Sequence, residues 1–433
     1  MTVPAPPLRV PRRAVLGGGL AAMAAALADP LRAQVLPART VHTAAELETA
    51  FAAAPDGSRI LLAPGRYDRA NLRNRSFARG LVLTSADPAQ RAVFAYNLYL
   101  DGVEGMTITG VDFATGGFFE HRGRLDKVQL GLTGCRNIVV QDGTFTGHIP
   151  TAQEGIDPEA PDLDRHFALA GYARDVGMAV NDSRQIRIEG LRLNDLRIAI
   201  TSEGSAGVEM LGLEIARARE GINLVDSRDL VIAACHFHSF RPWLSRASPK
   251  RDHPDMIQYW AGKAGRGIDG LTVRDCLFHQ GPGDPWTQTI FGHMQNVKTG
   301  TSLATGVKVT GNTIVNRHIW GIYFGDARDV DIAGNLLLPS PDLPDAPAPL
   351  NTPTISLERA SEVRVRGNTL LPYQGLARPI RAEPEALADG RVRVERDNRF
   401  LATRPVMPEF WRKLEPDLSS PAAAYRAGRG WPG

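Results

Sequence analysis

The chain has 433 residues, of which 43% are hydrophobic, 22% charged and only 7% aromatic. This apolar fraction is that of a protein that folds around a core, so wholesale disorder is excluded. The 50 basic and 47 acidic residues give a net charge of +3, and no basic block carries interleaved aromatic residues, so we expect no nucleic-acid partner.

The N-terminus predicts export. Arg12 and Arg13 precede an uncharged run of small and apolar residues that ends at Ala28. This is the pattern of a signal peptide, and the run is too short for a membrane span. The paired arginines favour a twin-arginine signal within residues 1–33, cleaved after Ala28 or Ala33, and an ordinary secretory signal is the alternative. Both predict a periplasmic or secreted protein without a membrane anchor, and its three cysteines are too few to hold the fold by disulfides.

A short helix and a strand are expected next. Residues 43–54 have apolar residues at helical spacing, and Thr43 with Glu46 three positions later forms a capping box. Residues 55–67 follow the pattern P-x-G-x-x-I-x-L-x-x-G-x-Y, which predicts a turn, a first strand and a tight turn. A helix in this place covers an open sheet edge, so we interpret it as an N-terminal cap.

A repeat of about 22 residues fills residues 40–400. Its clearest copies begin at Gly221, Gly321 and Thr354 and align without a gap over three short strands of alternating apolar residues. Short strands at this period, without hairpin turns, predict an all-β fold, a single-stranded right-handed parallel β-helix of about ten coils. The apolar anchor of the middle strand runs from Ile108 in the first clear coil to Val392 in the last. Residues 401–433 are predicted to form a tail that packs on the last coils.

One corner of the coil carries the same residue type in successive repeats. Stacked asparagines there can satisfy the backbone groups of the turn. Two cysteines occupy the same position in earlier coils, and we expect them to be buried ladder residues, with a disulfide between them as the alternative. The ladder comprises Cys235, Cys276, Asn312, Asn335, Asn368 and Asn398.

One face of the first strand is predicted to form a trough. Its outward-facing residues are expected to be Asp101, Gly131, Ala179, Thr201, Asn223, Gln258, Phe291, Tyr323 and Ser356. The long insertions that interrupt the 22-residue repeat lie beside this strand, at residues 147–176, 239–255, 279–288, 293–304 and 339–352. Insertions in a solenoid form loops that commonly flank the binding face, and a trough between loops suits a polymer.

The cap and the coil pattern resemble secreted β-helix polysaccharide lyases, including the chondroitinase B and alginate lyase family of the pectate lyase superfold. The resemblance implies a parallel β-helix, cleavage of an acidic, uronate-containing polysaccharide by β-elimination, and a calcium ion. That family usually pairs a Lys with an Arg about one coil later. Here Lys250 and Lys263 have only Arg274 at a plausible distance, on a different strand.

Residues suited to a saccharide site concentrate between residues 236 and 320. Aromatic faces stack on sugar rings, amides bind hydroxyl groups, and cations bind carboxylates. We predict that the substrate is bound by Asn223, Gln258, Trp260, His279, Asp284, Trp286, His293, His318 and Trp320.

β-Elimination needs a group that neutralises the substrate carboxylate, a base and an acid. Arg251 is the candidate neutraliser, with Asn223 or Gln258 as alternatives. The base is predicted to be His253 or Lys250, and the acid Tyr323. The predicted catalytic set is Lys250, Arg251, His253, Asp255 and Tyr323.

His253 and Asp255 belong to the stretch Asp-His-Pro-Asp, which leads into a trough strand. Pro254 fixes the local backbone, and a loop-closing hydrogen-bonded turn is the alternative role of this stretch. Its composition, but not its order, is similar to the Asp-Pro-His-Asp motif of β-helix mannuronan epimerases, so no role is transferred from that motif.

Three other functions remain open. A glycoside hydrolase of polygalacturonase type needs paired carboxylates, for which Asp226, Asp255, Asp284 and Asp326 are available. Asp226 and Asp326 lie in a repeated turn, where Asp commonly bonds to the backbone. A uronate epimerase and a non-catalytic carbohydrate-binding solenoid are the remaining alternatives. We predict a lyase, expect it to be a monomer, and assign no metal ligands.

Overall fold

The computed structural model describes residues 37–114, 128–148, 176–241, 254–280, 287–294, 303–340, 352–371, 379–401 and 418–428. The predicted signal peptide lies outside these residues. Within them, no helix is long and apolar enough to cross a membrane.

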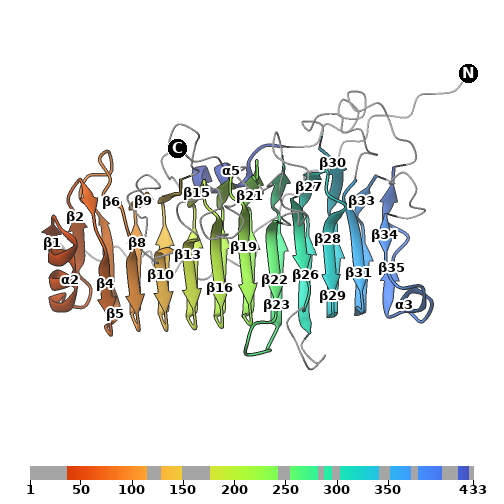
Figure 1. Cartoon of the computed structure of the whole chain (residues 1–433), viewed down its shortest axis with the longest axis horizontal. Coiled ribbons are helices and arrows are strands. Elements are labelled where there is room, and N and C mark those ends of the chain that lie inside the picture. The colour runs from red at the N-terminus through yellow and green to blue at the C-terminus, as the bar shows by residue number, and fades with distance from the viewer. Residues whose placement is uncertain are drawn as a thin grey trace, which may run out of the picture.

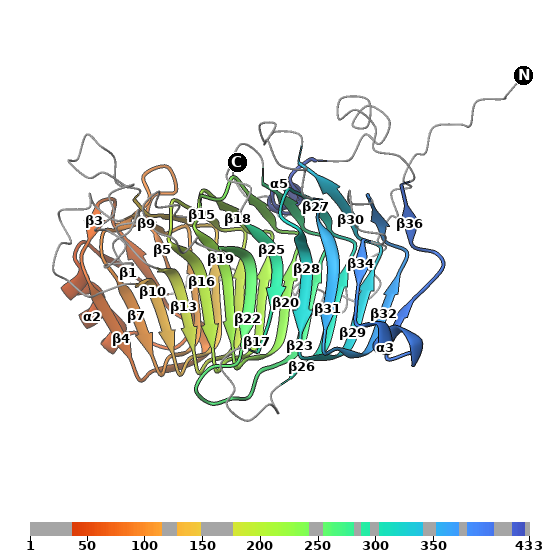
Figure 2. The same cartoon turned by 45° about the vertical axis from the view of Figure 1, so that its right-hand side comes forward.

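Three parallel sheets wind around one long core (Figures 1 and 2). We name them sheet A, with 13 strands, sheet B, with 12, and sheet C, with 11. In each regular coil the chain passes through sheet C, then sheet A, then sheet B, and every strand pairs in parallel with its neighbours in the coils before and after it. The predicted right-handed parallel β-helix is confirmed. The ten predicted anchors, Ile108 to Val392, lie on the ten strands of sheet A from β8 to β35, and β1, β2 and β5 precede them.

The strands of sheet A are β1 (Ala38–Val41), β2 (Arg59–Leu62), β5 (Ser76–Ser85), β8 (Glu104–Thr109), β11 (Arg136–Gln141), β14 (Arg184–Glu189), β17 (Ala206–Leu211), β20 (Arg228–Ala233), β23 (Ile268–Arg274), β26 (Ala304–Thr310), β29 (Ala327–Ala333), β32 (Ser361–Arg366) and β35 (Val392–Val394). Those of sheet B are β3 (Arg66–Tyr67), β6 (Val93–Phe94), β9 (Asp112–Ala114), β12 (Thr144–Thr146), β15 (Arg192–Asn194), β18 (Glu214–Ala216), β21 (His236–His238), β24 (Leu277–His279), β27 (Thr313–Asn316), β30 (Leu336–Pro339), β33 (Thr369–Leu370) and β36 (Arg399–Phe400). Those of sheet C are β4 (Ala70–Arg73), β7 (Leu98–Asp101), β10 (Val128–Thr133), β13 (Val176–Asn181), β16 (Ile198–Glu203), β19 (Glu220–Val225), β22 (Asp255–Trp260), β25 (Gln288–Gly292), β28 (Trp320–Gly325), β31 (Thr354–Glu358) and β34 (Ile380–Arg381).

The core is built by stacking equivalent residues of successive coils. Alternate residues of each strand point inward, and the parallel register places each on the same residue of the next coil. The rings of Phe94 and Phe113 lie 5.5 Å apart, and those of Phe113 and Phe145 lie 4.4 Å apart. Such columns make one continuous apolar interior along the solenoid.

The corner between sheets A and B holds the predicted asparagine ladder. The backbone N–H of Asn312 donates to Oδ1 of Asn335 at 3.0 Å, and that of Asn335 donates to Oδ1 of Asn368 at 2.9 Å. Asn398 continues the series, since its Oδ1 accepts from Asn368 at 3.1 Å. The ladder is therefore confirmed as a device that satisfies buried backbone groups. Cys235 and Cys276, which precede it, are buried and not joined by a disulfide.

Helices lie at the N-terminal end, at the C-terminal end and on one side. At the N-terminal end, α2 (Ala44–Ala53) begins with the predicted capping box, because Thr43 accepts from the backbone of Glu46 at 3.1 Å and Glu46 accepts from that of His42 at 2.8 Å. Its face with Leu47 and Phe51 is buried. The short helix α3 (Pro384–Ala388) lies at the opposite end (Figure 1).

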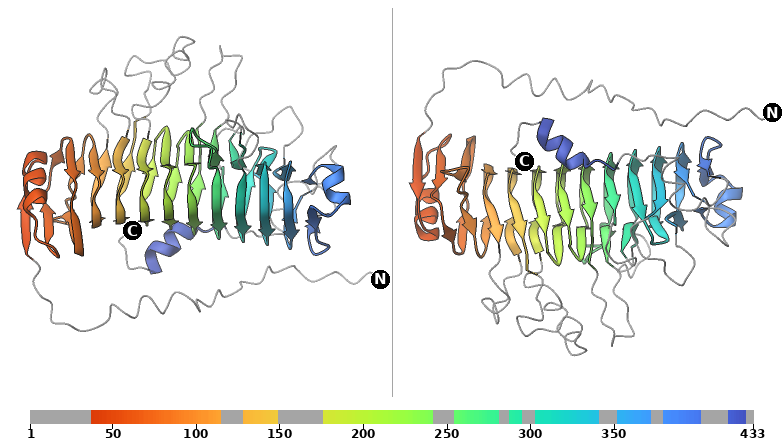
Figure 3. Two further views of the ribbon diagram at one scale, coloured as in Figure 1. Left: turned by 90° about the horizontal axis from the view of Figure 1, so that it is seen from below. Right: turned by 90° about the horizontal axis from the view of Figure 1, so that it is seen from above.

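The third helix, α5 (Pro421–Gly428), lies beside the middle coils (Figure 3). The Tyr425 hydroxyl donates to Glu189 of β14 at 3.1 Å, and Arg426 donates to Glu214 of β18 at 2.7 Å. A Cβ atom on Gly212 would lie 2.2 Å from the Tyr425 ring, so this glycine makes room for it. The prediction that the tail packs on the last coils is therefore wrong for the described part of the tail, because its partners are these carboxylates and this glycine in the middle of the solenoid.

Candidate active site

The outer face of sheet C carries the predicted row of outward residues. The register joins Tyr99, Gly131, Ala179, Thr201, Asn223, Gln258, Phe291, Tyr323 and Ser356 across neighbouring strands. The predicted row is thus confirmed from Gly131 onward. Asp101 is a wrong assignment, since it lies two residues beyond Tyr99, and Ile108 was likewise chosen in place of Met106. A shift by two residues keeps the alternation of a strand, so the pattern alone cannot detect it.

The predicted insertions enter or leave this sheet. Residues 147–176, 239–255, 279–288 and 339–352 connect a strand of sheet B to one of sheet C, and residues 293–304 connect β25 of sheet C to β26 of sheet A. The chain order therefore brings long connections to both ends of the strands of sheet C.

Three rings on β25 and β28 form what we call the aromatic platform. The ring centres of Phe291 and Tyr323 lie 4.8 Å apart with planes 12° from parallel. Trp320 lies 5.3 Å from Phe291 and 5.1 Å from Tyr323. The rings come together because Phe291 and Tyr323 are register partners and Trp320 begins the same strand as Tyr323. Flat aromatic surface of this kind suits the apolar face of a sugar ring.

Beside the platform is a group of charged and polar residues, His293, Asp326, Glu358 and Arg359, which we call the ionic cluster. The Arg359 guanidinium donates to both carboxylate oxygens of Asp326, at 2.7 and 3.0 Å, and also to Glu358. This bidentate pair joins the turns that follow β28 and β31. Hydrogen bonds from Arg359 hold the pKa of Asp326 below its usual range.

His293 is held in one tautomer by the same arginine. Its Nε2 lies 3.0 Å from Nη2 of Arg359. A guanidinium only donates, so Nε2 accepts and the proton of the neutral ring resides on Nδ1. The Cδ2 atom of His293 lies close to Gly325, where an added Cβ would approach it to 2.5 Å. His293 is therefore held in place next to Arg359.

Tyr323 links the aromatic platform to the ionic cluster. Its hydroxyl donates to Glu358 across the gap between β28 and β31. Burial and the hydrogen bond to Glu358 raise the pKa of Tyr323, while the same bond lowers that of Glu358. At neutral pH Tyr323 carries its proton, which is compatible with the predicted role as an acid.

His318 contacts Trp320 of the aromatic platform. Its Nδ1 accepts from the backbone N–H of Trp320 at 3.1 Å, and the two rings lie 5.5 Å apart. Burial lowers the pKa of His318 to about 4. It is a neutral positioning group at neutral pH.

The other predicted binding residues lie in different surroundings. Asn223 is in the outward row but only 3% exposed, and its amide donates to Glu220 at 2.8 Å. Gln258 and Trp260 are half-buried on β22, and Gln258 is the register partner of Phe291. His279 lies on β24 of sheet B and is therefore not on the outer face of sheet C, because its strand completes the coil that precedes β25.

The predicted catalytic residues other than Tyr323 are not seen on the outer face of sheet C. Asp255 begins β22 but has the inward parity of Ile257 and is 0% exposed, so its carboxylate does not face the trough. Lys250, Arg251 and His253 lie outside the described residues, as do Asp284 and Trp286 of the binding set. Asp226 performs the predicted backbone role, since it accepts from the N–H groups of Ala264, Arg266 and Gly267 at 2.9 to 3.1 Å.

The structure thus unites His293, His318, Trp320 and Tyr323 with Phe291, which was predicted only as a trough residue. It adds Glu358 and Arg359, for which no site role was predicted. One signal was present: the gapless alignment of repeats places Arg359 where Asp226 and Asp326 stand in other coils. An opposite charge at the same turn of the next coil implies an ion pair. Within the described ranges, no group of three or more His, Cys, Asp or Glu could hold a metal ion, so these residues do not supply the ligands for the calcium that the resemblance implies.

The fold is similar to that of solved structures at low sequence identity. An alginate lyase from Paenibacillus sp. str. FPU-7 aligns over 76% of this chain and 99% of its own, with a TM-score of 0.50 and 15% identity. A rhamnogalacturonan lyase aligns over 74% and 82%, with a TM-score of 0.46 and 10% identity, and the Dettilon tailspike protein over 75% and 57%, with 0.45 and 11%. No protein-family model matches the sequence, and no curated protein matches it significantly.

Proposed function

We propose that the protein is an exported enzyme that binds an acidic polysaccharide along the outer face of sheet C and cleaves it by β-elimination. The observation that carries the proposal is the aromatic platform lying directly beside the ionic cluster, with Tyr323 belonging to the platform and bonded to the cluster. A platform that binds a sugar next to a fixed proton carrier is an arrangement suited to saccharide chemistry.

Binding is assigned to the platform and its neighbours. Trp320 is half-buried and offers a ring face to a sugar, while Phe291, 7% exposed, supports it. Gln258, one strand from Phe291 in the same row, offers an amide to the hydroxyl groups of the sugar. The long connections at both ends of the strands favour a polymer that runs across several coils. The alginate lyase with this fold supports a polysaccharide substrate.

The reaction breaks two bonds and forms one double bond. A base removes the proton next to the uronate carboxylate, the electron pair forms the carbon–carbon double bond, and the bond to the glycosidic oxygen breaks. Tyr323 gives its proton to that leaving oxygen. His253 or Lys250 is proposed as the base and Arg251 as the neutraliser of the substrate carboxylate, all three in the connection that leads into β22.

Arg359 has a positioning role in this scheme. It donates to Glu358, which in turn accepts from the Tyr323 hydroxyl, so this carboxylate fixes the place of the proton donor. The positive charge of Arg359 is already paired with the carboxylates of Asp326 and Glu358.

Hydrolysis is less favoured by the described carboxylates. An inverting or retaining hydrolase needs one carboxyl group whose pKa is raised so that it can act as an acid. Hydrogen bonds hold the pKa values of both Asp326 and Glu358 below their usual range. Asp226 is bonded to the backbone and Asp255 is buried.

The test is a product assay on a panel of acidic polysaccharides. Elimination gives an unsaturated uronate, whose ultraviolet absorbance rises with each cleavage, and we expect this signal on at least one uronate polymer. New reducing ends without that absorbance would replace the proposal with hydrolysis. A protein that binds the polymers but yields neither signal would be a carbohydrate-binding solenoid.

A further inference from the structure

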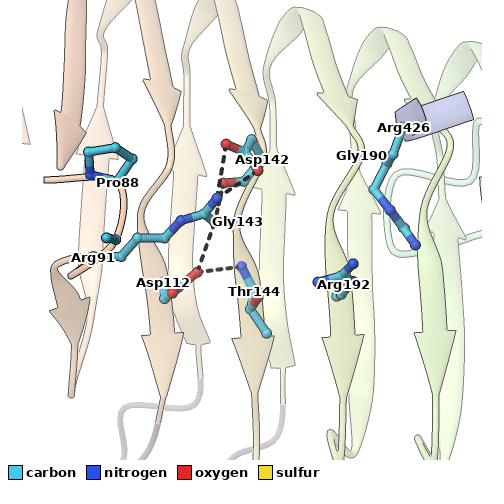
Figure 4. Close-up of a pocket in the computed structure, with 10 residues that line it drawn as sticks. Pro88, Arg91, Asp112, Asp142, Gly143, Thr144, Gly190, Arg192 and Arg426 are labelled. Carbon is cyan, nitrogen blue, oxygen red and sulfur yellow. Dashed lines mark hydrogen bonds and ion pairs between the residues drawn. The ribbon is translucent and has the colours of Figure 1, made fainter. Parts of the chain in front are cut away.

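A polar cleft lies away from the outer face of sheet C. It has a volume of about 410 Å³ and lies where sheets A and B meet, next to α5 (Figure 4). This volume is within the range of small-molecule sites. Its charged lining consists of Arg91, Asp112, Asp142, Arg192 and Arg426.

One end of the cleft holds one guanidinium and two carboxylates, an excess of one negative charge. Arg91 donates to both carboxylate oxygens of Asp142, at 3.0 and 3.1 Å, and lies 3.6 Å from Asp112. Asp112 also accepts from the backbone N–H of Thr144 at 2.9 Å. The dashed lines in Figure 4 show these contacts. This end has no charge that lacks a partner.

The other end has more arginine than carboxylate. Arg426 donates to Glu214 at 2.7 Å, and Arg192 lies 3.8 Å from the same oxygen. The other oxygen of Glu214 lies 3.5 Å from Nε2 of His238. Hydrogen bonds from His238 and Arg426 lower the pKa of Glu214 to about 2, so it is ionised at neutral pH. Two guanidinium groups and one carboxylate leave an excess of one positive charge.

Arg426 also retains an unused donor. The residue is 7% exposed, and its Nη1 is enclosed without a hydrogen-bond partner. A buried donor without an acceptor costs free energy, which an incoming acceptor recovers. The Arg192 side chain is 39% exposed and offers the accessible donors. In Figure 4 both side chains lie on the same side of Asp112 and Asp142, and that of Arg426 extends down from α5.

We propose that Arg192 and Arg426 form a binding site for a small oxyanion of the phosphate or sulfate type, bridging α5 and β15. Guanidinium groups match the geometry of such oxyanions. Among the described residues, those that line the cleft include no aromatic ring on which a sugar could stack, which favours a small anion over a saccharide ring. The site is separate from the proposed active site, and it does not depend on the reaction proposed there.

The experiment measures thermal midpoints of the wild-type protein against inorganic sulfate and phosphate, with ionic strength held constant by chloride because charge screening alone shifts stability. We expect a saturable rise. Arg192→Gln should weaken the apparent affinity by about tenfold or more. Arg399→Gln is the matched control, because the register of sheet B places Arg399 at the same position of its coil as Arg192. This control should respond like the wild type.

Two results would overturn the proposal: a response no larger than that to chloride, or the same response in Arg192→Gln as in the wild type. A second arm uses an oligouronate without inorganic oxyanion. A rise that is lost in Arg192→Gln identifies the acidic group of a polymer as the anion. A rise kept in Arg192→Gln belongs to another face and, together with the sulfate response, supports a free anion as the ligand.

Discussion

The asparagine ladder and the ionic cluster both join polar side chains across neighbouring coils, but they differ in burial and in composition. The ladder repeats one residue type, and Asn335 within it is 1% exposed. The ionic cluster combines four residue types, and the Arg359 side chain is 49% exposed.

This difference separates structural from functional polar groups in a solenoid. Every ladder amide bonds to the backbone or to the next amide, so the ladder holds the coils together. Exposed ion pairs contribute little to stability. The ionic cluster is therefore better explained by what it does to Tyr323 than by what it adds to the fold.

The largest effect is expected from Tyr323→Phe, which keeps the ring of the platform and removes the hydroxyl. Loss of a positioned proton donor should reduce kcat by about 10²- to 10⁴-fold. Steady-state kinetics on the polymer identified by the product assay would measure it, and the thermal midpoint should remain close to that of the wild type. An unchanged kcat would remove Tyr323 from the reaction.

Asn335→Ala is expected to act on stability alone. It leaves the backbone N–H of Asn312 and further ladder groups without partners, at a cost of about 2–5 kcal/mol. Urea unfolding would measure the loss, with Lys308→Ala, an outward residue of β26, as a control that should change little. A ladder variant that lost turnover per folded molecule would contradict the separation of the two regions.

Trp320→Ala should weaken binding more than it slows the reaction. Loss of one ring from the platform should raise KM about threefold to tenfold, while Trp320→Phe, which keeps an aromatic face, should lose less. Inhibition by a short oligouronate would report the same ranking. If both variants bound as the wild type does, the platform would not be the sugar site.

The smallest effect is expected from Asp326→Asn, whose effect on stability depends on pH. The pKa of Asp326 is lowered from its usual value of 3.8, so its ion pair stabilises the fold above about pH 4 and loses this contribution as the pH falls through the lowered value. Asp326→Asn should thus cost about 0.2–1 kcal/mol at pH 6, and the difference from wild type should vanish at low pH. Thermal melts of both proteins from low pH to pH 6 would test whether the difference in stability grows as the pH rises.

The fold could be predicted because the repeat that encodes it occurs in many copies. Each copy carries the same alternation and the same corner residue, so the copies that begin at Gly221, Gly321 and Thr354 fix the frame, and Asn312 to Asn398 fix the corner. The frame failed at Asp101 and Ile108, because a shift by two residues keeps the alternation of apolar residues. It also could not place α5, whose contacts with Glu189 and Glu214 join residues more than 200 positions apart.

The site was predicted only in part because it depends on contacts between coils. His293, Trp320 and Tyr323 were recognised from residue type and position. Glu358 and Arg359 were not, since each is an ordinary turn residue until the register sets it beside Tyr323 and Asp326. Asp255 and His279 have suitable chemistry but do not lie on the outer face of sheet C. Asp255 has the inward parity of its strand, and His279 belongs to sheet B.

The central claim is that substrate binds and reacts on the outer face of sheet C at the aromatic platform. The most direct test is a crystal structure of the Tyr323→Phe variant with an oligosaccharide of the polymer that the enzyme cleaves. The account predicts a sugar ring against Phe291 or Trp320 and a glycosidic oxygen near the position of the missing hydroxyl. A sugar bound only in the early coils, over Gly131 and Ala179, or only on sheets A or B, would contradict it.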